Sequence, residues 1–176
     1  VADFSNNRVL AWWDKNTLTI GKAADYVLGQ NSMTAVSANQ GGTASAQTMY
    51  NPRIVNVSGG KLLVSEFGNN RVLIWNTIPS STSAANVAAD VVVGQSSFSG
   101  VAAATTAVGL SRPYMAQIIN GKLFICDYSN ARILIYNTVP TANGASADWV
   151  IGQSTPTAFS INNRGISGWS VYLPTE

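Results

Sequence analysis

Three copies of one sequence motif divide the chain into repeats of about 61 residues. Each copy begins with an acidic residue, contains an Asn-x-Arg pattern and ends with an aromatic residue. The copies run from Asp3 to Trp12, from Glu66 to Trp75 and from Asp127 to Tyr136. A second motif, Ala-Asp-x-Val-x-Gly-Gln, ends at Gln30, Gln95 and Gln153, and prolines follow at positions 52, 113 and 174. Because these landmarks keep the same order, the chain is built from repeats of one structural unit.

Each repeat is expected to contain four short β-strands, and the second repeat gives the clearest pattern. Its expected strands cover residues 54–57, 61–65, 71–75 and 90–93. The third of these strands is rich in β-branched and aromatic residues, which favour strands. In the third repeat, an Asn-Gly pair between the first two strands is a strong hairpin signal. No segment has the period of an amphipathic helix, so the sequence predicts an all-β chain.

A period of about 61 residues with four antiparallel strands is typical of one blade of a β-propeller. A β-solenoid is the alternative, but its repeats are shorter and lack two hairpins. The blade repeats are expected at residues 1–51, which is incomplete, at 52–112 and at 113–173, with 174–176 starting the next blade. The sequence therefore predicts a single propeller segment of about three four-stranded blades.

The segment from Val64 to Leu73 and its copies resemble the core of the NHL repeat. The additional Ala-Asp-x-Val-x-Gly-Gln strand is similar to that of long-period NHL-type propellers, which are common in bacterial secreted and surface proteins. This resemblance covers essentially the whole chain. It implies a β-propeller that is extracellular or at the cell surface. Because this fold hosts binding modules, scaffolds and several enzymes, the resemblance alone does not define the function.

The repeats at the two ends of the sequence are incomplete. When the repeats are aligned, no residues correspond to positions 55–63 of the second repeat, which hold most of a first strand and the start of a second. Propellers usually contain four to eight blades, so three blades do not close a ring. We expect the chain to be half of a longer six-bladed propeller. The alternative is that incomplete chains complete one another as a closed homo-oligomer or a filament.

The composition excludes most catalytic and metal-binding chemistry. The chain contains no histidine and a single cysteine, Cys126, so histidine-dependent triads, zinc motifs and intrachain disulfides are excluded. Only 10% of the residues are charged and the net charge is +2, which is too little to neutralise a nucleic acid backbone. No apolar run approaches the roughly 20 residues of a transmembrane helix. We expect no enzymatic activity, no cofactor or metal, no nucleic acid partner and no membrane insertion.

Nine charged residues recur at fixed repeat positions and are expected to have structural roles. They are Asp3, Arg8, Glu66, Arg71, Asp127, Arg132, Asp25, Asp90 and Asp148. Each acid of the first motif lies five residues before an arginine, across a tight turn, where the two can pair with each other and with loop amides. Calcium binding is the alternative for this turn, because carboxylates and amides are calcium ligands, but the EF-hand pattern is absent.

Residues that differ between the repeats are better candidates for a binding site. Arg53 follows one repeat proline, whereas Arg112 precedes the next and Tyr114 follows it. Thr175 holds the third equivalent position. All lie at the start of a first strand, which in a propeller lines the mouth of the central channel. A basic and aromatic channel mouth can bind an anion, a glycan or a peptide terminus, although solvated loop residues are the alternative.

The sequence therefore favours a non-enzymatic extracellular or cell-surface propeller that binds a protein or glycan ligand or serves as a scaffold. One alternative is a structural subunit whose incomplete blades assemble with other chains. A lesser alternative is one part of a propeller enzyme, similar to amidating lyases or lactonase-like hydrolases, with its site in a missing half.

Overall fold

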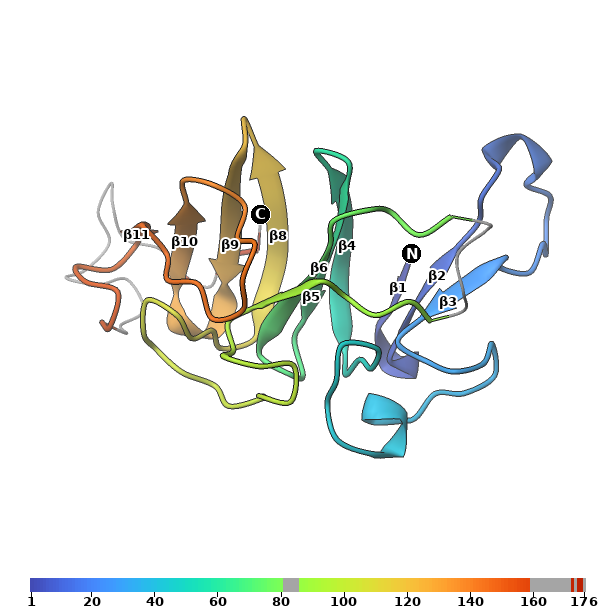
Figure 1. Cartoon of the computed structure of the whole chain (residues 1–176), viewed down its shortest axis with the longest axis horizontal. Coiled ribbons are helices and arrows are strands. Elements are labelled where there is room, and N and C mark those ends of the chain that lie inside the picture. The colour runs from blue at the N-terminus through green and yellow to red at the C-terminus, as the bar shows by residue number, and fades with distance from the viewer. Residues whose placement is uncertain (81–85, 159–171, 173, 176) are drawn as a thin grey trace.

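The computed structural model of the chain describes residues 1–80, 86–158, 172, 174 and 175. Within these residues the chain forms three antiparallel sheets that lie side by side (Figure 1). None of the three sheets closes on itself within the described residues, and strands that are neighbours in a sheet are also consecutive in the sequence. The helical segments of the described residues are short 3-10 helices: η1 (Phe4–Asn6), η2 (Lys15–Thr17), η3 (Ala38–Gly41) and η4 (Tyr128–Asn130). The prediction of an all-β chain is confirmed.

Each sheet corresponds to one repeat of the sequence. The first sheet contains β1 (Ala2–Asp3), β2 (Arg8–Ala11) and β3 (Tyr26–Leu28). The second sheet contains β4 (Pro52–Ser58), β5 (Lys61–Glu66), β6 (Arg71–Trp75) and β7 (Val91–Val93). The third sheet contains β8 (Pro113–Ile119), β9 (Lys122–Asp127), β10 (Arg132–Tyr136) and β11 (Trp149–Ile151). The four strands predicted in the second repeat are confirmed to within two residues at each end.

The second sheet is covered on both faces, and its sequence explains why. All five residues of β6 and all three of β7 are buried. Apart from Arg71, these strands are uninterrupted apolar runs, which are typical of strands that are covered on both sides, because a strand with one wet face alternates apolar and polar residues. The second sheet therefore has to pack between two neighbours.

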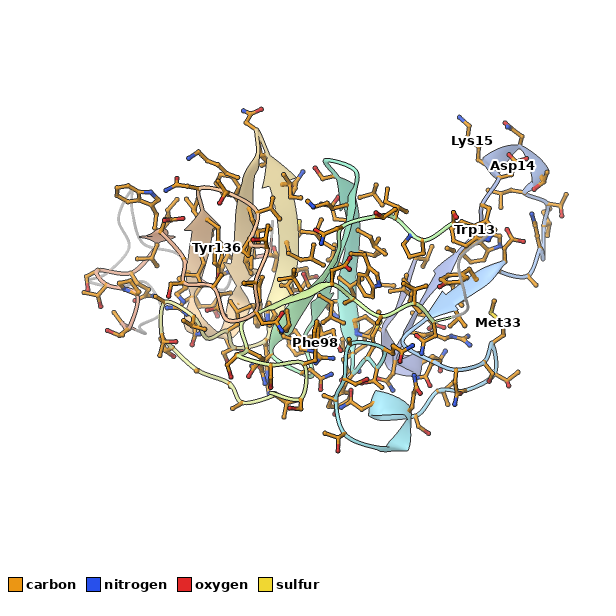
Figure 2. All side chains as sticks on the ribbon, viewed as in Figure 1. Trp13, Asp14, Lys15, Met33, Phe98 and Tyr136 are labelled. Atoms are coloured by element: carbon orange, nitrogen blue, oxygen red, sulfur yellow. The ribbon has the colours of Figure 1, made fainter. Side chains whose placement is uncertain are left out.

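Two apolar cores join the three sheets. Between the first and second sheets the core contains Val9, Tyr26, Leu28, Leu62, Val64, Leu73, Trp75 and Val92. Between the second and third sheets it contains Leu63, Val72, Ile74, Val91, Val93, Ala116, Ile118, Leu123, Ile125, Leu134 and Tyr136. Burial of one large apolar side chain contributes about 1.5–3 kcal/mol, so these cores dominate the packing of sheet on sheet. Trp75 and Tyr136, at equivalent positions of the second and third repeats, are 1% and 2% exposed in these cores, whereas Trp12 at the same position of the first repeat is half-buried. Tyr136 is labelled in Figure 2.

The first strands of the second and third sheets lie next to each other. Nδ2 of Asn56 in β4 donates to the carbonyl oxygen of Ala116 in β8 at 3.4 Å, and Oγ of Ser58 donates to that of Ile118 at 2.8 Å. These side-chain bonds fix the two strands against each other without a shared backbone ladder. The starts of β4 and β8 also lie close together, because Nη2 of Arg53 donates to Oη of Tyr114 at 3.1 Å.

Candidate functional site

Every repeat contains a clamp, which consists of an acid, an asparagine three residues later and an arginine five residues later. In the second repeat, Nε of Arg71 donates to Oε2 of Glu66 at 2.5 Å, and Nδ2 of Asn69 donates to Oε1 of Glu66 at 2.8 Å. In the third repeat, Nε of Arg132 donates to Oδ2 of Asp127 at 2.7 Å. Both arginine–carboxylate pairs are fully buried. The predicted pairing across the turn is thus confirmed.

The arginine of each clamp also holds the loops on either side of its sheet. Arg71 donates to the carbonyl oxygen of Phe98, after β7, and to those of Ser45 and Thr48, before β4. In the third repeat, the acceptors of Arg132 are the carbonyl oxygens of Thr106, Gly109 and Pro156. In the first repeat, the acceptor of Arg8 is the carbonyl oxygen of Met33; Met33 and Phe98 are labelled in Figure 2. Each clamp therefore ties one turn to its neighbouring loops.

Burial and pairing shift the pKa values of the acids in the two buried clamps in opposite directions. Desolvation raises the pKa of Glu66 and of Asp127, and it is the largest influence on each. The adjacent guanidinium and the hydrogen bonds to each carboxylate lower the same pKa values, but by less. Since these oxygens accept from arginine, asparagine and backbone N–H groups, the turn is closed by donors, and calcium is not needed to explain it.

The Ala-Asp-x-Val-x-Gly-Gln motif forms a second set of contacts within the scaffold. In the second repeat, Oδ2 of Asp90 accepts from the backbone N–H of Asn76 at 2.7 Å, at the end of β6. Nε2 of Gln95 donates to the carbonyl oxygens of Asn70 and Ala102, at 2.9 and 2.8 Å. The copies Asp25 and Asp148 accept from the backbone N–H groups of Trp13 and Asn137. All nine repeat-bound charged residues therefore have contacts inside the scaffold.

The residues that differ between repeats lie where the ladders of β4 and β8 are interrupted. The pairing between β4 and β5 shifts between Pro52 and Ile54, so Arg53 occupies a β-bulge. The pairing between β8 and β9 shifts in the same way between Pro113 and Met115, which places Tyr114 in a bulge. A bulge redirects the side chain of its additional residue and often lies beside a functional site.

The structure brings Arg53 and Tyr114 into contact although they lie in different sheets. Nη2 of Arg53 donates to Oη of Tyr114 at 3.1 Å, and Cζ of Arg53 lies 4.6 Å from the centroid of the Tyr114 ring. The same guanidinium lies 5.1 Å from the ring centroid of Phe4 and 6.0 Å from that of Phe67. These distances are within the range of cation–π attraction, about 0.5–1 kcal/mol at exposed sites. Three aromatic rings thus hold one exposed guanidinium in place.

Arg112 adds a second cation next to the first. Its Cζ lies 5.6 Å from the ring centroid of Phe67. Its backbone has a φ of 51°, a left-handed conformation that costs residues other than Gly, Asn and Asp about 1–2 kcal/mol. Nearby, the ring of Tyr128 connects Phe67 to Tyr114, with centroid distances of 6.1 and 5.9 Å. We call Arg53, Arg112, Phe4, Phe67, Tyr114 and Tyr128 the arginine–aromatic cluster.

Within the described residues, no carboxylate balances the positive charge of this cluster. No ion pair among the described residues includes Arg53 or Arg112, and both side chains belong to exposed residues. The bond to Tyr114 uses one of the five N–H donors of the Arg53 guanidinium. The cluster therefore has positive charge and hydrogen-bond donors available for a ligand.

Three of the rings were not singled out from the sequence. Phe4, Phe67 and Tyr128 each directly follow the acid of a clamp, so a signal was present in the repeat. An aromatic residue in every copy was consistent with packing alone. Only the structure shows that these three positions from different sheets converge around the arginines. Thr175, at the third equivalent position, is exposed and belongs to none of these contacts.

A separate apolar cleft of about 390 Å³ lies between the first sheet, β4, β5 and the loop after β6. It is lined by Val1, Val9, Leu10, Ala11, Trp12, Trp13, Tyr26, Leu28, Val55, Val57, Leu62, Ile78 and Pro79. None of the residues of the arginine–aromatic cluster lines it, and the lining contains no charged side chain. We therefore base the functional proposal on the cluster, which carries charge and donors, and not on this cleft.

Among the described residues, no group of three or more His, Cys, Asp and Glu side chains is placed to hold a metal ion. In the same part of the chain, no helix has both the length and the apolar character needed to cross a membrane. No protein-family model matches the chain, and no curated protein is significantly similar to it.

Proposed function

We propose that the chain is a segment of an NHL-type β-propeller that acts as a non-enzymatic binding module outside the cell. Three consecutive repeats that each form one antiparallel sheet, with β4 and β8 adjacent, support this arrangement. In such a fold the first strands surround a central channel, and their starts lie at its mouth.

The observation that carries the proposal is the arginine–aromatic cluster at the starts of these strands. Two exposed guanidinium groups lie on aromatic rings and have no carboxylate partner among the described residues. Guanidinium groups bind carboxylates through paired, charge-assisted hydrogen bonds, and aromatic rings pack against the apolar faces of sugars. We therefore assign an acidic glycan, one with carboxylate groups on its sugars, as the ligand.

The roles of the acidic residues support a binding protein more than an enzyme. Three acids are held in the clamps by arginine and asparagine. Three more accept from backbone N–H groups at strand ends. Six of the eight acidic residues are thus used to hold turns and loops together.

Calorimetric titration with a galacturonic acid trisaccharide tests this proposal, with neutral galactotriose as the matched ligand. We expect the acidic sugar alone to bind, and we expect the double variant Arg53→Ala/Arg112→Ala to weaken binding at least tenfold. Lys15→Ala is the matched control, because Lys15 is an exposed cation in η2, outside the cluster, and its removal should leave binding unchanged. Equal binding of both sugars, or undiminished binding by the double variant, would contradict the proposal.

A further inference from the structure

The third sheet has one apolar face with no neighbouring sheet among the described residues. Within β10, Leu134 and Tyr136 face the second sheet and are buried in the shared core. Because side chains alternate along a strand, Ile133 and Ile135 lie on the opposite face. Phe124 and Trp149 each pair with Ile135, and Ile151 pairs with Ile133. Since paired residues of neighbouring strands lie on the same face, these three side chains belong to that face as well. We call Phe124, Ile133, Ile135, Trp149 and Ile151 the open face.

The equivalent face of the second sheet is fully covered. Its residues at the same repeat positions are Leu63, Val72, Ile74, Val91 and Val93, and none is more than 2% exposed. They pack on the third sheet in the core described above. By contrast, Trp149 is 64% exposed and Ile151 is 44% exposed. The open face has the composition of a covered face, but no sheet of the described residues covers it.

The opposite end of the molecule presents the complementary kind of face. In the second sheet, Leu73 and Trp75 belong to the face that packs on the first sheet. At the same positions in the first sheet, Leu10 and Trp12 are only half-buried. The outer face of the first sheet therefore carries residues at the same repeat positions as the face of the second sheet that packs on the first sheet.

We propose that the open face binds the outer face of the first sheet in a second copy of this chain. The contact would continue, between two chains, the packing that already joins the first sheet to the second and the second to the third. Such a contact is heterologous, because two different faces meet, and two copies related by a twofold axis can form it twice and close a ring of six sheets. This inference does not depend on the ligand assigned above.

Analytical ultracentrifugation across a wide concentration range tests the assembly. We expect the wild-type chain to sediment as a dimer of twice 18.5 kDa. The double variant Trp149→Asp/Ile151→Asp should be monomeric, because it places charge in the open face. Leu10→Asp should also be monomeric, because it places charge in the complementary face. Ile20→Asp is the matched control and should remain dimeric, because Ile20 is fully exposed in the loop before β3.

A mixture of the two monomeric variants makes the test specific. In a dimer of either variant alone, every contact includes one charged face. In the mixture, the intact open face of the Leu10→Asp variant can bind the intact first-sheet face of the Trp149→Asp/Ile151→Asp variant. We expect an equimolar mixture to regain a dimer with weaker association than wild type. Circular dichroism on each variant checks that the fold is retained. A wild-type chain that stays monomeric at all concentrations, or a mixture that does not associate, would overturn the proposal and leave the face to another repeat of a longer polypeptide.

Failure of this proposal is distinguishable from failure of the proposed function. The sedimentation experiment changes residues at the outer faces of the end sheets, whereas the titration changes residues at the starts of β4 and β8. A monomer that binds the acidic sugar would overturn the assembly alone, and a dimer that ignores the sugar would overturn the ligand alone.

Discussion

Four arginines of the described residues form two groups that differ in their surroundings. Arg71 and Arg132 are buried, pair with an acid and recur at one position of every repeat. Arg53 and Arg112 are exposed, have no carboxylate partner among the described residues and occur where the repeats differ. The first group holds turns and loops in place. The second group leaves its charge available to a ligand, so the proposed binding site lies where the repeats differ and not at the positions that recur in every repeat.

The largest expected effect comes from breaking a buried clamp. Arg71→Ala leaves the Glu66 carboxyl buried without its partner and removes three hydrogen bonds to loop carbonyls. We expect the free energy of unfolding to fall by about 3–5 kcal/mol, measured by urea denaturation. Desolvation of Glu66 would then no longer be opposed by the guanidinium, so its pKa would rise further.

The clamp of the first repeat provides the matched comparison. The side chains of Arg8 and Asp3 are 15% and 26% exposed, and their 2.7 Å pair is partly solvated. Arg8→Ala should therefore lower the free energy of unfolding by only about 1–2 kcal/mol. Equal effects of Arg8→Ala and Arg71→Ala would show that burial does not set the strength of these clamps.

A smaller effect of opposite sign is expected at Arg112. Its φ of 51° suits asparagine better than arginine, and Asn51 holds the equivalent position before β4 with a φ of 49°. We expect Arg112→Asn to raise the free energy of unfolding by about 1 kcal/mol while it weakens binding of the acidic trisaccharide. The reciprocal change Asn51→Arg should be destabilising. If Arg112→Asn leaves binding unchanged, the backbone strain at this position serves no ligand.

Much of the fold could be predicted from the sequence, because the same motifs recur at the same spacing in three repeats. The strands of the second sheet and the pairing of acid and arginine in the clamps were expected from periodicity and spacing. The tight turn expected before each clamp arginine is present, and Asn7 and Asn70 adopt left-handed φ values of 56° and 53° in it. Local rules suffice for such features, since the residues involved lie within a few positions of one another.

The arginine–aromatic cluster could be predicted only in part, because it depends on contacts between sheets. Arg53 and Tyr114 are 61 residues apart, and only the packing of β4 beside β8 brings them together. Phe4 lies in η1 and Phe67 in the turn between β5 and β6, so they belong to different repeats, and nothing local in the sequence predicts that they meet. The sequence predicts that three blades leave the ring open. Which side chains lie exposed on the open face follows only from the structure.

The most direct test of the account is to observe the two groups of arginines in one experiment. The Nε–Hε signals of the arginine side chains can be followed by NMR while the galacturonic acid trisaccharide is added. We expect the signals of Arg53 and Arg112 to shift and saturate together, whereas those of Arg71 and Arg132 stay unchanged. Unchanged signals for Arg53 and Arg112, or shifts confined to the buried clamps, would contradict the assignment of the cluster as the binding site.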